Sequence, residues 1–314
     1  MDLSRDLWHL KYLTIVLMFI FVLLFLFGHH GDAKKQTLQM NHLVDEKTLV
    51  YFPTVARYKR EVHFKGISQY DQPDGSKTWF EEWNYYTSEH VGTHIDAPVH
   101  FGKNGPGNRW YIEDIPFERF IGPAVVVDVS DKADIDTNVD YGATIEDIQE
   151  YERQFGAIPS GAILLIHTGW GKYWGDQVKY AGTDTRDEKK AHFPSLSPEA
   201  AQWIAEDGRI VGVGVDSSSC DTGDQLDTAA HVNLFEKNVY CLENVANLGQ
   251  LPRKGATIYV MPIPIKGGSG APSRVYATWD DGLFSGFTLK SATAPFLVGG
   301  LIWGYILYFY NHNI

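Results

Sequence analysis

The pattern of apolar and polar positions predicts alternating strands and helices along the middle of the chain. Runs rich in β-branched residues predict buried strands at 125–129, 162–167, 209–216 and 256–261. One amphipathic helix is predicted to begin with Thr144 as N-cap and Asp147 three residues later, and to stop at Gly156. A second is predicted to begin at Ser197 and stop at Gly208. Strands that alternate with helices favour a mixed α/β fold.

Both ends of the chain carry apolar runs without a charge. Residues 12–27 read YLTIVLMFIFVLLFLF, and residues 296–310 read FLVGGLIWGYILYFY. The first run is long for a signal peptide and short for a membrane span, so residues 1–33 are predicted to be a cleaved signal or a retained signal-anchor. The tail, residues 285–314, is a candidate membrane anchor. These ends predict a secretory-pathway protein, secreted or membrane-associated, with a domain at 37–284.

Composition and charge narrow the class of protein. The chain has 314 residues, of which 44% are hydrophobic and 21% charged, and this is typical of globular proteins rather than disordered ones. The formal net charge of -12 disfavours nucleic acid and anionic membrane surfaces as partners. The two cysteines, Cys220 and Cys241, are too few for a disulfide framework. They would pair in an oxidising compartment and remain buried thiols in a reducing one.

Candidate chemistry is concentrated in the segment HVGTHIDAPVH, residues 90–100. His90, His94, Asp96 and His100 all stand at even positions, so an extended backbone would point three imidazoles and a carboxylate the same way. Such a set of nitrogen and oxygen donors suits Zn²⁺ or Mn²⁺. A lone histidine is seldom a ligand, but this segment holds three of the chain's 12 histidines.

A second pair of donors, His231 and Glu243, lies far downstream in HVNLFEKNVYCLEN. Alone, this pair would be unremarkable. The metal segment needs further ligands from another part of the chain to complete a coordination shell, and this need makes His231 and Glu243 candidates.

The segment 90–100 resembles the H-x-G-T-H-x-D-x-P-x-H signature of the cyclase family, which includes bacterial-type kynurenine formamidases and isatin hydrolases. The likeness runs from about residue 42 to 276. Further matching pieces are LLIHTGW at 164–170, FPSLSPE at 193–199, GVD at 214–216 and KGGSG at 266–270. The resemblance implies a single mixed α/β domain with a barrel-like mixed sheet flanked by helices. It also implies a dimer or larger homo-oligomer.

The resemblance assigns metal ligands residue by residue. It makes His90, His94 and Asp96 ligands of one metal, and His231 and Glu243 the downstream ligands. Asp96 and Glu243 would be able to bridge to a second ion, so one or two Zn²⁺ or Mn²⁺ ions are implied. Glu243 stands where mononuclear isatin-hydrolase-like members have Gln, which leaves a two-metal site open.

The resemblance also assigns two residues that would act on the substrate. His100 matches the family's catalytic acid/base, with a pKa expected near working pH. Phe52, before Pro53, stands closest to the Trp before Pro with which the family's formamidases hold an aromatic substrate. Phe keeps a π face but lacks the indole N–H. This difference leaves open whether N-formylkynurenine is the substrate, and with it a place in tryptophan catabolism.

Together with these residues, the resemblance implies a metal-dependent amidohydrolase that acts on C–N bonds other than peptide bonds and is arylformamidase-like. Its expected substrate is a small aromatic formamide, lactam or other cyclic amide, attacked by metal-activated water. The alternative is a membrane-tethered binding protein that keeps the metal scaffold without turnover. Ser217 to Ser219 lack a G-x-S-x-G elbow, which argues against serine chemistry. The lack of Cys among the candidate ligands argues against a purely structural zinc site.

Overall fold

The computed structural model describes residues 14, 34–50, 55–102 and 108–280. Residues Thr37–Trp279 form one compact unit. Its strands, with the start of β1 and the end of β12 just outside the unit, are β1 (Lys35–Gln39), β2 (Lys59–Asp71), β3 (Lys77–Tyr86), β4 (His94–Asp96), β5 (Ile121–Asp128), β6 (Gly142–Ala143), β7 (Ala162–His167), β8 (Ser195–Leu196), β9 (Ile210–Val215), β10 (Tyr240–Glu243), β11 (Ala256–Pro262) and β12 (Gly270–Asp280). Its α-helices are α2 (Ile145–Phe155), α3 (Gln177–Ala181), α4 (Pro198–Asp207) and α5 (Ala229–Phe235). Short 3₁₀ turns lie at Ile112–Asp114, Phe117–Phe120, Trp170–Tyr173, Glu188–Lys190 and Leu248–Gln250.

The main sheet is a closed mixed barrel. Its strand order is β1-β12-β11-β5-β7-β9-β10-β4, and β4 also pairs with β12, which closes the last seven strands on themselves. Strands β5, β7, β9 and β10 run parallel, whereas β4, β11 and β12 join by antiparallel pairs. The expectation of a mixed α/β domain with a barrel-like sheet is confirmed.

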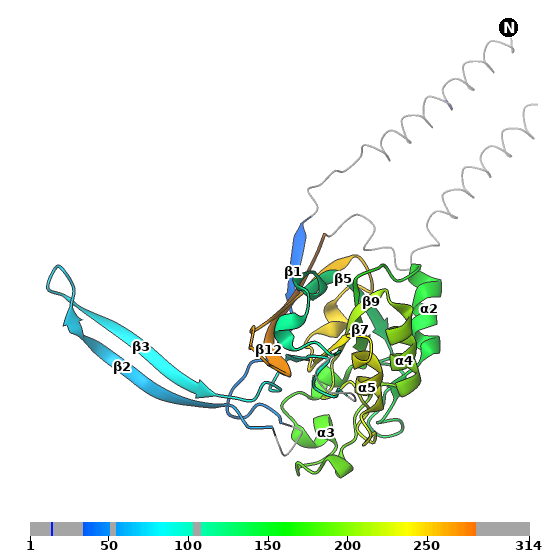
Figure 1. The fold of residues 1–314 in the computed structure, drawn as a ribbon, viewed down its shortest axis with the longest axis horizontal. Coiled ribbons are helices and arrows are strands. Elements are labelled where there is room, and N and C mark those ends of the chain that lie inside the picture. The colour runs from blue at the N-terminus through cyan, green and yellow to red at the C-terminus, as the bar shows by residue number, and fades with distance from the viewer. Residues whose placement is uncertain (1–13, 15–33, 51–54, 103–107, 281–314) are drawn as a thin grey trace, which may run out of the picture. The chain divides into compact units, whose positions relative to one another are not determined.

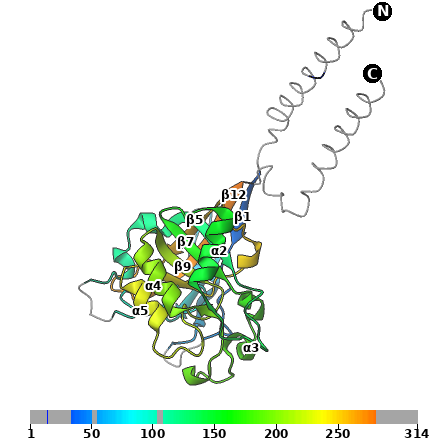
Figure 2. The same ribbon diagram turned by 90° about the vertical axis from the view of Figure 1, so that its right-hand side faces the viewer.

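Alternate residues of each strand divide the apolar core into two layers. Val126 and Leu165 belong to a cluster inside the barrel, whereas Val125 and Leu164 belong to a cluster under the helices. Figures 1 and 2 show α2, α4 and α5 side by side over strands β5, β7 and β9. The ring of Tyr240 fills barrel space beside β9, where a Cβ on Gly212 would lie 2.2 Å from it. Burial on both faces explains why the strand sequences read as continuous apolar runs.

The two predicted helices form where their capping residues stand. Thr144 caps α2 by accepting a hydrogen bond from the backbone of Asp147, whose carboxylate accepts one from the backbone N–H of Thr144 at 2.7 Å. The Ser197 hydroxyl accepts from the backbone of Ala200 at the start of α4, and Gly208 ends that helix with φ 75°.

One long element was not predicted. Strands β2 and β3 form a two-stranded sheet of their own, joined by antiparallel pairs from Lys59↔Tyr86 to Asp71↔Lys77, and the ribbon is seen in Figure 1. Most of their side chains are exposed, including large apolar ones such as Ile67 and Trp79. With no buried face, these strands lack the apolar alternation that marks a half-buried strand.

The predicted secretory-pathway location, secreted or membrane-associated, is corrected by the structure. No helix in the described part of the chain is both long and apolar enough to cross a membrane. Apart from Thr14, both apolar runs lie outside the described residues.

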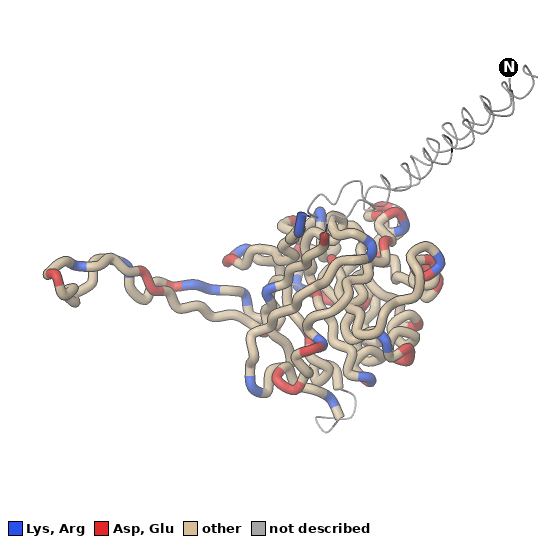
Figure 3. Tube along the Cα trace, turned by 90° about the horizontal axis from the view of Figure 1, so that it is seen from above, with Lys and Arg blue, Asp and Glu red and all other residues tan. Residues whose placement is uncertain are grey.

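The described surface carries charges of both signs. Figure 3 shows Lys and Arg interspersed with Asp and Glu around the molecule. Several of these charges pair locally, as Arg153 does with Glu150 at 2.7 Å on the exposed side of α2.

Candidate metal centre

Strand β4 sets the direction of the central side chains. Ile95 packs inside the barrel, so its neighbours His94 and Asp96 point to the opposite face. In the antiparallel pair with β10, His94 lies opposite Glu243. Directly opposite residues project from the same face of a sheet, so the register places the Glu243 carboxylate beside the imidazole of His94.

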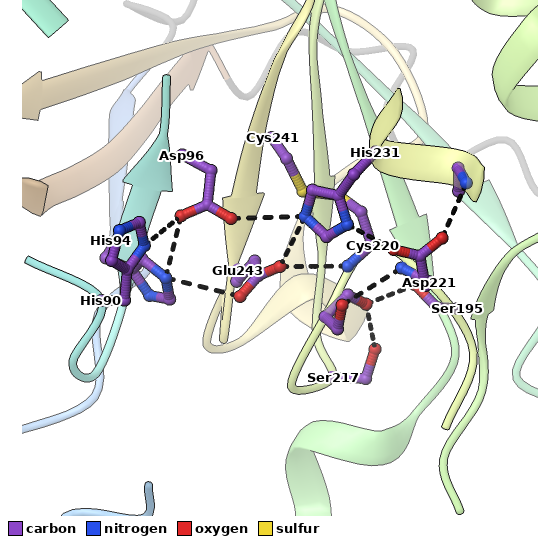
Figure 4. The surroundings of a disulfide bond; sticks show 12 residues. His90, His94, Asp96, Ser195, Ser217, Cys220, Asp221, His231, Cys241 and Glu243 are labelled. Carbon is purple, nitrogen blue, oxygen red and sulfur yellow. Dashed lines mark hydrogen bonds and ion pairs between the residues drawn. A yellow bond between two sulfur atoms is a disulfide. The ribbon is translucent and has the colours of Figure 1, made fainter. Parts of the chain in front are cut away.

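The two carboxylates lie between imidazoles on either side (Figure 4). Asp96 Oδ1 lies 2.6 Å from His90 Nδ1 and 3.2 Å from His94 Nε2, and Asp96 Oδ2 lies 3.3 Å from His231 Nε2. Glu243 Oε2 lies 3.4 Å from His94 Nε2, and Glu243 Oε1 lies 3.1 Å from His231 Nε2. Residues from three separate parts of the chain thus meet at one point, as the sequence motifs required.

The segment 90–100 brings its histidines together, but not as the extended strand that the even spacing predicted. Only His94–Asp96 is a strand, and turns flank it on both sides. Gly92 adopts φ 67°, where a Cβ would also lie 2.8 Å from Val44. His90 therefore reaches Asp96 from a turn, with its Nε2 3.0 Å from the Ser269 hydroxyl.

Helix α5 and the loop before it position His231. The Asp221 carboxylate accepts a hydrogen bond from the backbone N–H of Ala230 at 2.7 Å and contacts His231 Nδ1 with its other oxygen. This contact turns His231 Nε2 toward Asp96 and Glu243. On the other side of the site, the backbone oxygen of Gly92 lies 2.9 Å from His94 Nδ1 and leaves its Nε2 facing the carboxylates.

Charge in this site is buried and mutually compensated. Burial disfavours the charged form of His94, but Asp96 and Glu243 outweigh it and raise the pKa of His94 to about 9. Burial likewise opposes the charge on His231, yet Asp221, Asp96 and Glu243 raise its pKa above the usual range. For Glu243, burial and the nearby charge of Asp96 raise the pKa. Two buried carboxylates side by side need positive charge beside them, which is why they raise the pKa of the neighbouring imidazoles.

The donor set fits a divalent metal ion. One donor atom each from His90, His94 and Asp96 lie within 4.8 Å of one another. Imidazole and carboxylate donors suit Zn²⁺ and Mn²⁺, and a bound cation would supply the positive charge that the two buried carboxylates need.

His100 lies beside this donor set. Its ring stacks on His90 with centroids 4.0 Å apart and meets Phe101 edge-on at 4.3 Å. Burial lowers the pKa of His100 to about 3, so the ring is neutral at pH 7. This corrects the expectation of a pKa near working pH: the sequence does not show that neighbouring rings shield His100 from water.

A cavity of about 380 Å³ opens onto the donor set and His100. Its polar end carries the residues already described, and its apolar wall is formed by Leu49, Val50, Val55, Phe101, Tyr180 and Ala181. The predicted substrate contact Phe52 lies outside the described residues.

Sequence reasoning missed the residues that hold the site in place. The side-chain amide of Asn244 donates to the oxygen of Gly92 at 3.0 Å, and the Thr93 hydroxyl donates to the backbone oxygen of Asn244 at 2.6 Å. Asp221 gave no signal, because it stands 10 residues from His231 and meets it only through the fold. Asp216, in the GVD segment at 214–216 that resembles the cyclase family, accepts hydrogen bonds from the backbone and hydroxyl of Thr168. These bonds fix the loop after β7.

Comparison with known proteins finds one matching family and several related hydrolases. The model of the Cyclase family matches residues 2–222. An isatin hydrolase of Roseibium aggregatum is 31% identical over 230 residues, which is 72% of this chain and 84% of that protein. A kynurenine formamidase of Bacillus cereus is 28% identical over 187 residues, which is 60% of this chain and 75% of that protein.

Solved structures share the fold. Isatin hydrolase A from Labrenzia aggregata, bound to benzyl benzoate, superposes with a TM-score of 0.67 at 33% identity, over 79% of this chain and 94% of that one. An isatin hydrolase bound to the product analogue thioisatinate also has a TM-score of 0.67, at 26% identity, over 85% of this chain and 99% of that one.

Proposed function

Since the chain belongs to the Cyclase family, we propose that it hydrolyses a small formamide, lactam or other cyclic amide at the cavity beside His94. The chain is a hydrolase of C–N bonds other than peptide bonds, as the likeness to isatin hydrolase and kynurenine formamidase indicates. The hydrolase domain of this proposal spans residues 37–284.

The observation that carries the proposal is the convergence of imidazoles and carboxylates at the end of an apolar cavity. In the proposal, His90, His94, Asp96, His231 and Glu243 hold one or two Zn²⁺ or Mn²⁺ ions. Each carboxylate turns one oxygen toward His94 and the other toward His231, which supports a bridging role and a second ion. An ion bound there supplies Lewis acidity, which acidifies water and polarises an amide carbonyl.

His100 is the proposed proton carrier of the reaction. In the proposal, His100 accepts a proton from the attacking water and returns it to the departing nitrogen. Stacking against His90 and contact with Phe101 hold the ring at the cavity edge. Phe101 also contacts His231, so one aromatic ring packs against both the proposed proton carrier and a proposed metal ligand.

The apolar wall supports an aromatic substrate. Leu49, Val50, Val55 and Tyr180 offer flat and branched surfaces of the kind that bury a planar ring. Phe52 is a proposed substrate contact, because Val50 and Val55 on either side of it in the sequence both line the cavity. N-formylkynurenine and isatin are the candidate substrates to test, since each carries an amide nitrogen on an aromatic ring.

The exposed hairpin supports the proposal of a homo-oligomer. An isolated two-stranded ribbon is marginally stable in water, and β2–β3 exposes paired apolar residues. Ile67 and Trp79 lie opposite each other in the register and are 57% and 56% exposed. A second copy of the chain would cover these exposed apolar side chains with apolar side chains of its own.

The test is a hydrolysis screen on full-length protein loaded with Zn²⁺ or Mn²⁺, using N-formylkynurenine, isatin and simple formamides. The proposal predicts turnover of at least one amide, abolished by chelation and restored by metal. Metal bound with tight binding of these amides but no turnover would instead favour a binding protein that keeps the scaffold.

A further inference from the structure

Cys220 and Cys241 form a disulfide, which the sequence left open. Both cysteines are completely buried, and their Cα atoms are 6.5 Å apart. Cys220 lies in the loop after β9, and Cys241 lies in β10 directly opposite the proposed ligand Asp96. The pair therefore sits at the edge of the metal centre (Figure 4).

The disulfide shares its surroundings with two proposed metal ligands. One donor atom each from Cys220, His231, Cys241 and Glu243 lie within 4.8 Å of one another, and all four residues are buried. The backbone N–H of Cys220 donates to Glu243 Oε1 at 3.1 Å. The next residue, Asp221, contacts His231 Nδ1. A change in the bonding of Cys220 and Cys241 would therefore alter the surroundings of both His231 and Glu243.

The chemistry of this cluster depends on the oxidation state of sulfur. Sulfur atoms bonded to each other are poor ligands, so the oxidised pair leaves His231 and Glu243 to face Asp96. Two thiolates, an imidazole and a carboxylate are instead a complete tetrahedral donor set for Zn²⁺. Thiolates also prefer thiophilic ions over Mn²⁺.

We propose that Cys220 and Cys241 form a redox-controlled second metal site. When the pair is reduced, its thiolates bind a thiophilic divalent cation together with His231 and Glu243. This binding withdraws the two shared ligands from the centre built on His90, His94 and Asp96. When a small-molecule disulfide oxidises the two cysteines, that disulfide leaves as two thiols, the Cys220–Cys241 bond re-forms, the bound cation is released and the shared ligands return to that centre.

Reduction requires a dithiol as co-reactant. Its two thiols give two electrons and two protons, the Cys220–Cys241 bond breaks into two thiols, and the dithiol becomes a cyclic disulfide. Because both sulfurs are buried, the test uses protein reduced in denaturant and refolded under the same reductant, with oxidised protein carried through the same steps. The dithiol is then removed in the absence of air, because it would itself bind Cd²⁺ through sulfur. Counting thiols with a chromogenic reagent in denaturant verifies each state.

The experiment titrates Cd²⁺ into reduced and oxidised full-length protein and follows the ultraviolet absorption band of cadmium–thiolate bonds. Reduced wild type should bind one Cd²⁺ with this band, and oxidised protein should show none. The Cys220→Ser/Cys241→Ser double variant should lack the band. No band in reduced wild type, or an equal band in the double variant, would overturn the proposal.

A second variant separates this site from the proposed catalytic function. His90→Ala removes a ligand of the first centre only, so reduced His90→Ala should keep the cadmium band whether or not the protein turns over any amide. A measurement without variants covers the case in which the serine variant does not fold. X-ray absorption of reduced, Zn²⁺-loaded wild type should show two sulfur neighbours, and a shell of nitrogen and oxygen alone would contradict the site.

Discussion

His100 stacks on His90 with ring centroids 4.0 Å apart, so the proposed proton carrier rests directly on a proposed metal ligand. Its ring also meets Phe101 edge-on, with centroids 4.3 Å apart. The two roles proposed for the eleven-residue segment, metal binding and proton transfer, thus meet at one contact.

We expect His100→Ala to retain metal and lose activity. Removing a positioned general base costs about 10²–10⁴-fold in rate, whereas the donor atoms around Asp96 are untouched. Metal content and kcat of the purified variant check this, with His192→Ala outside the cavity as the control. A turnover number within a few-fold of wild type would show that His100 does not carry the proton.

We expect Asp221→Asn to weaken metal binding without removing a ligand. The amide no longer holds His231 Nδ1 as a carboxylate does, and loss of such a supporting contact costs about 10–100-fold in metal affinity. Calorimetric titration with Zn²⁺ measures the effect, with Asp224→Asn nearby in the same loop as the matched control. Equal affinities in the two variants would contradict this positioning role.

Metal affinity should rise with pH. In the metal-free protein, burial opposes the charge of His94 but Asp96 and Glu243 raise its pKa to about 9, so the ring is protonated at pH 7. A metal must displace this proton, and apparent affinity should therefore increase about tenfold or more for each pH unit from 7 toward 9. Titrations with Mn²⁺ at several pH values test this. A flat profile would mean that His94 is not a ligand.

The raised pKa of His94 also predicts how the stability of the metal-free protein depends on pH. A pKa raised on folding stabilises the native state below the unfolded value of 6.5, and this stabilisation is lost as the pH rises through about 9. Thermal unfolding of chelated protein should therefore show a falling Tm across this window. The metal-loaded protein serves as the control, because its His94 carries no proton to lose.

The β2–β3 hairpin should form the interface between copies of the chain in the oligomer. Replacing Ile67 and Trp79 together by Ser removes an apolar pair from one face of β2–β3, so the variant should shift toward monomer in light scattering after size exclusion. Leu226→Ser, which changes a similarly exposed apolar side chain elsewhere, should leave the mass unchanged. An unchanged oligomer in the hairpin variant would place the interface on another surface.

Capping of α2 gives a stability prediction independent of the site. Thr144→Ala removes the side chain that accepts from the Asp147 backbone, which should cost about 1 kcal/mol and lower Tm by about 2–4 °C. Chemical denaturation measures the difference. Gln154→Ala, on the exposed side of the same helix, should change stability much less, and equal losses would argue against the cap.

Local signals in the sequence were sufficient for part of the fold and for the proposed ligands. Capping residues such as Thr144 and Ser197 act within one turn, so their helices could be predicted directly. The His-rich segment could be found because its donors are crowded in sequence. Asp221 and Asn244, which hold the site in place, could not be found from the sequence. They reach His231 and Gly92 only after distant loops pack together.

The central claim is that this chain is a metal-dependent amide hydrolase, and metal content paired with turnover tests it most directly. Full-length protein prepared in Zn²⁺ or Mn²⁺ buffer should contain one or two ions per chain and hydrolyse an aromatic formamide or cyclic amide. Turnover should be lost on chelation and return with the ion. Protein that binds no ion from either buffer would contradict the claim.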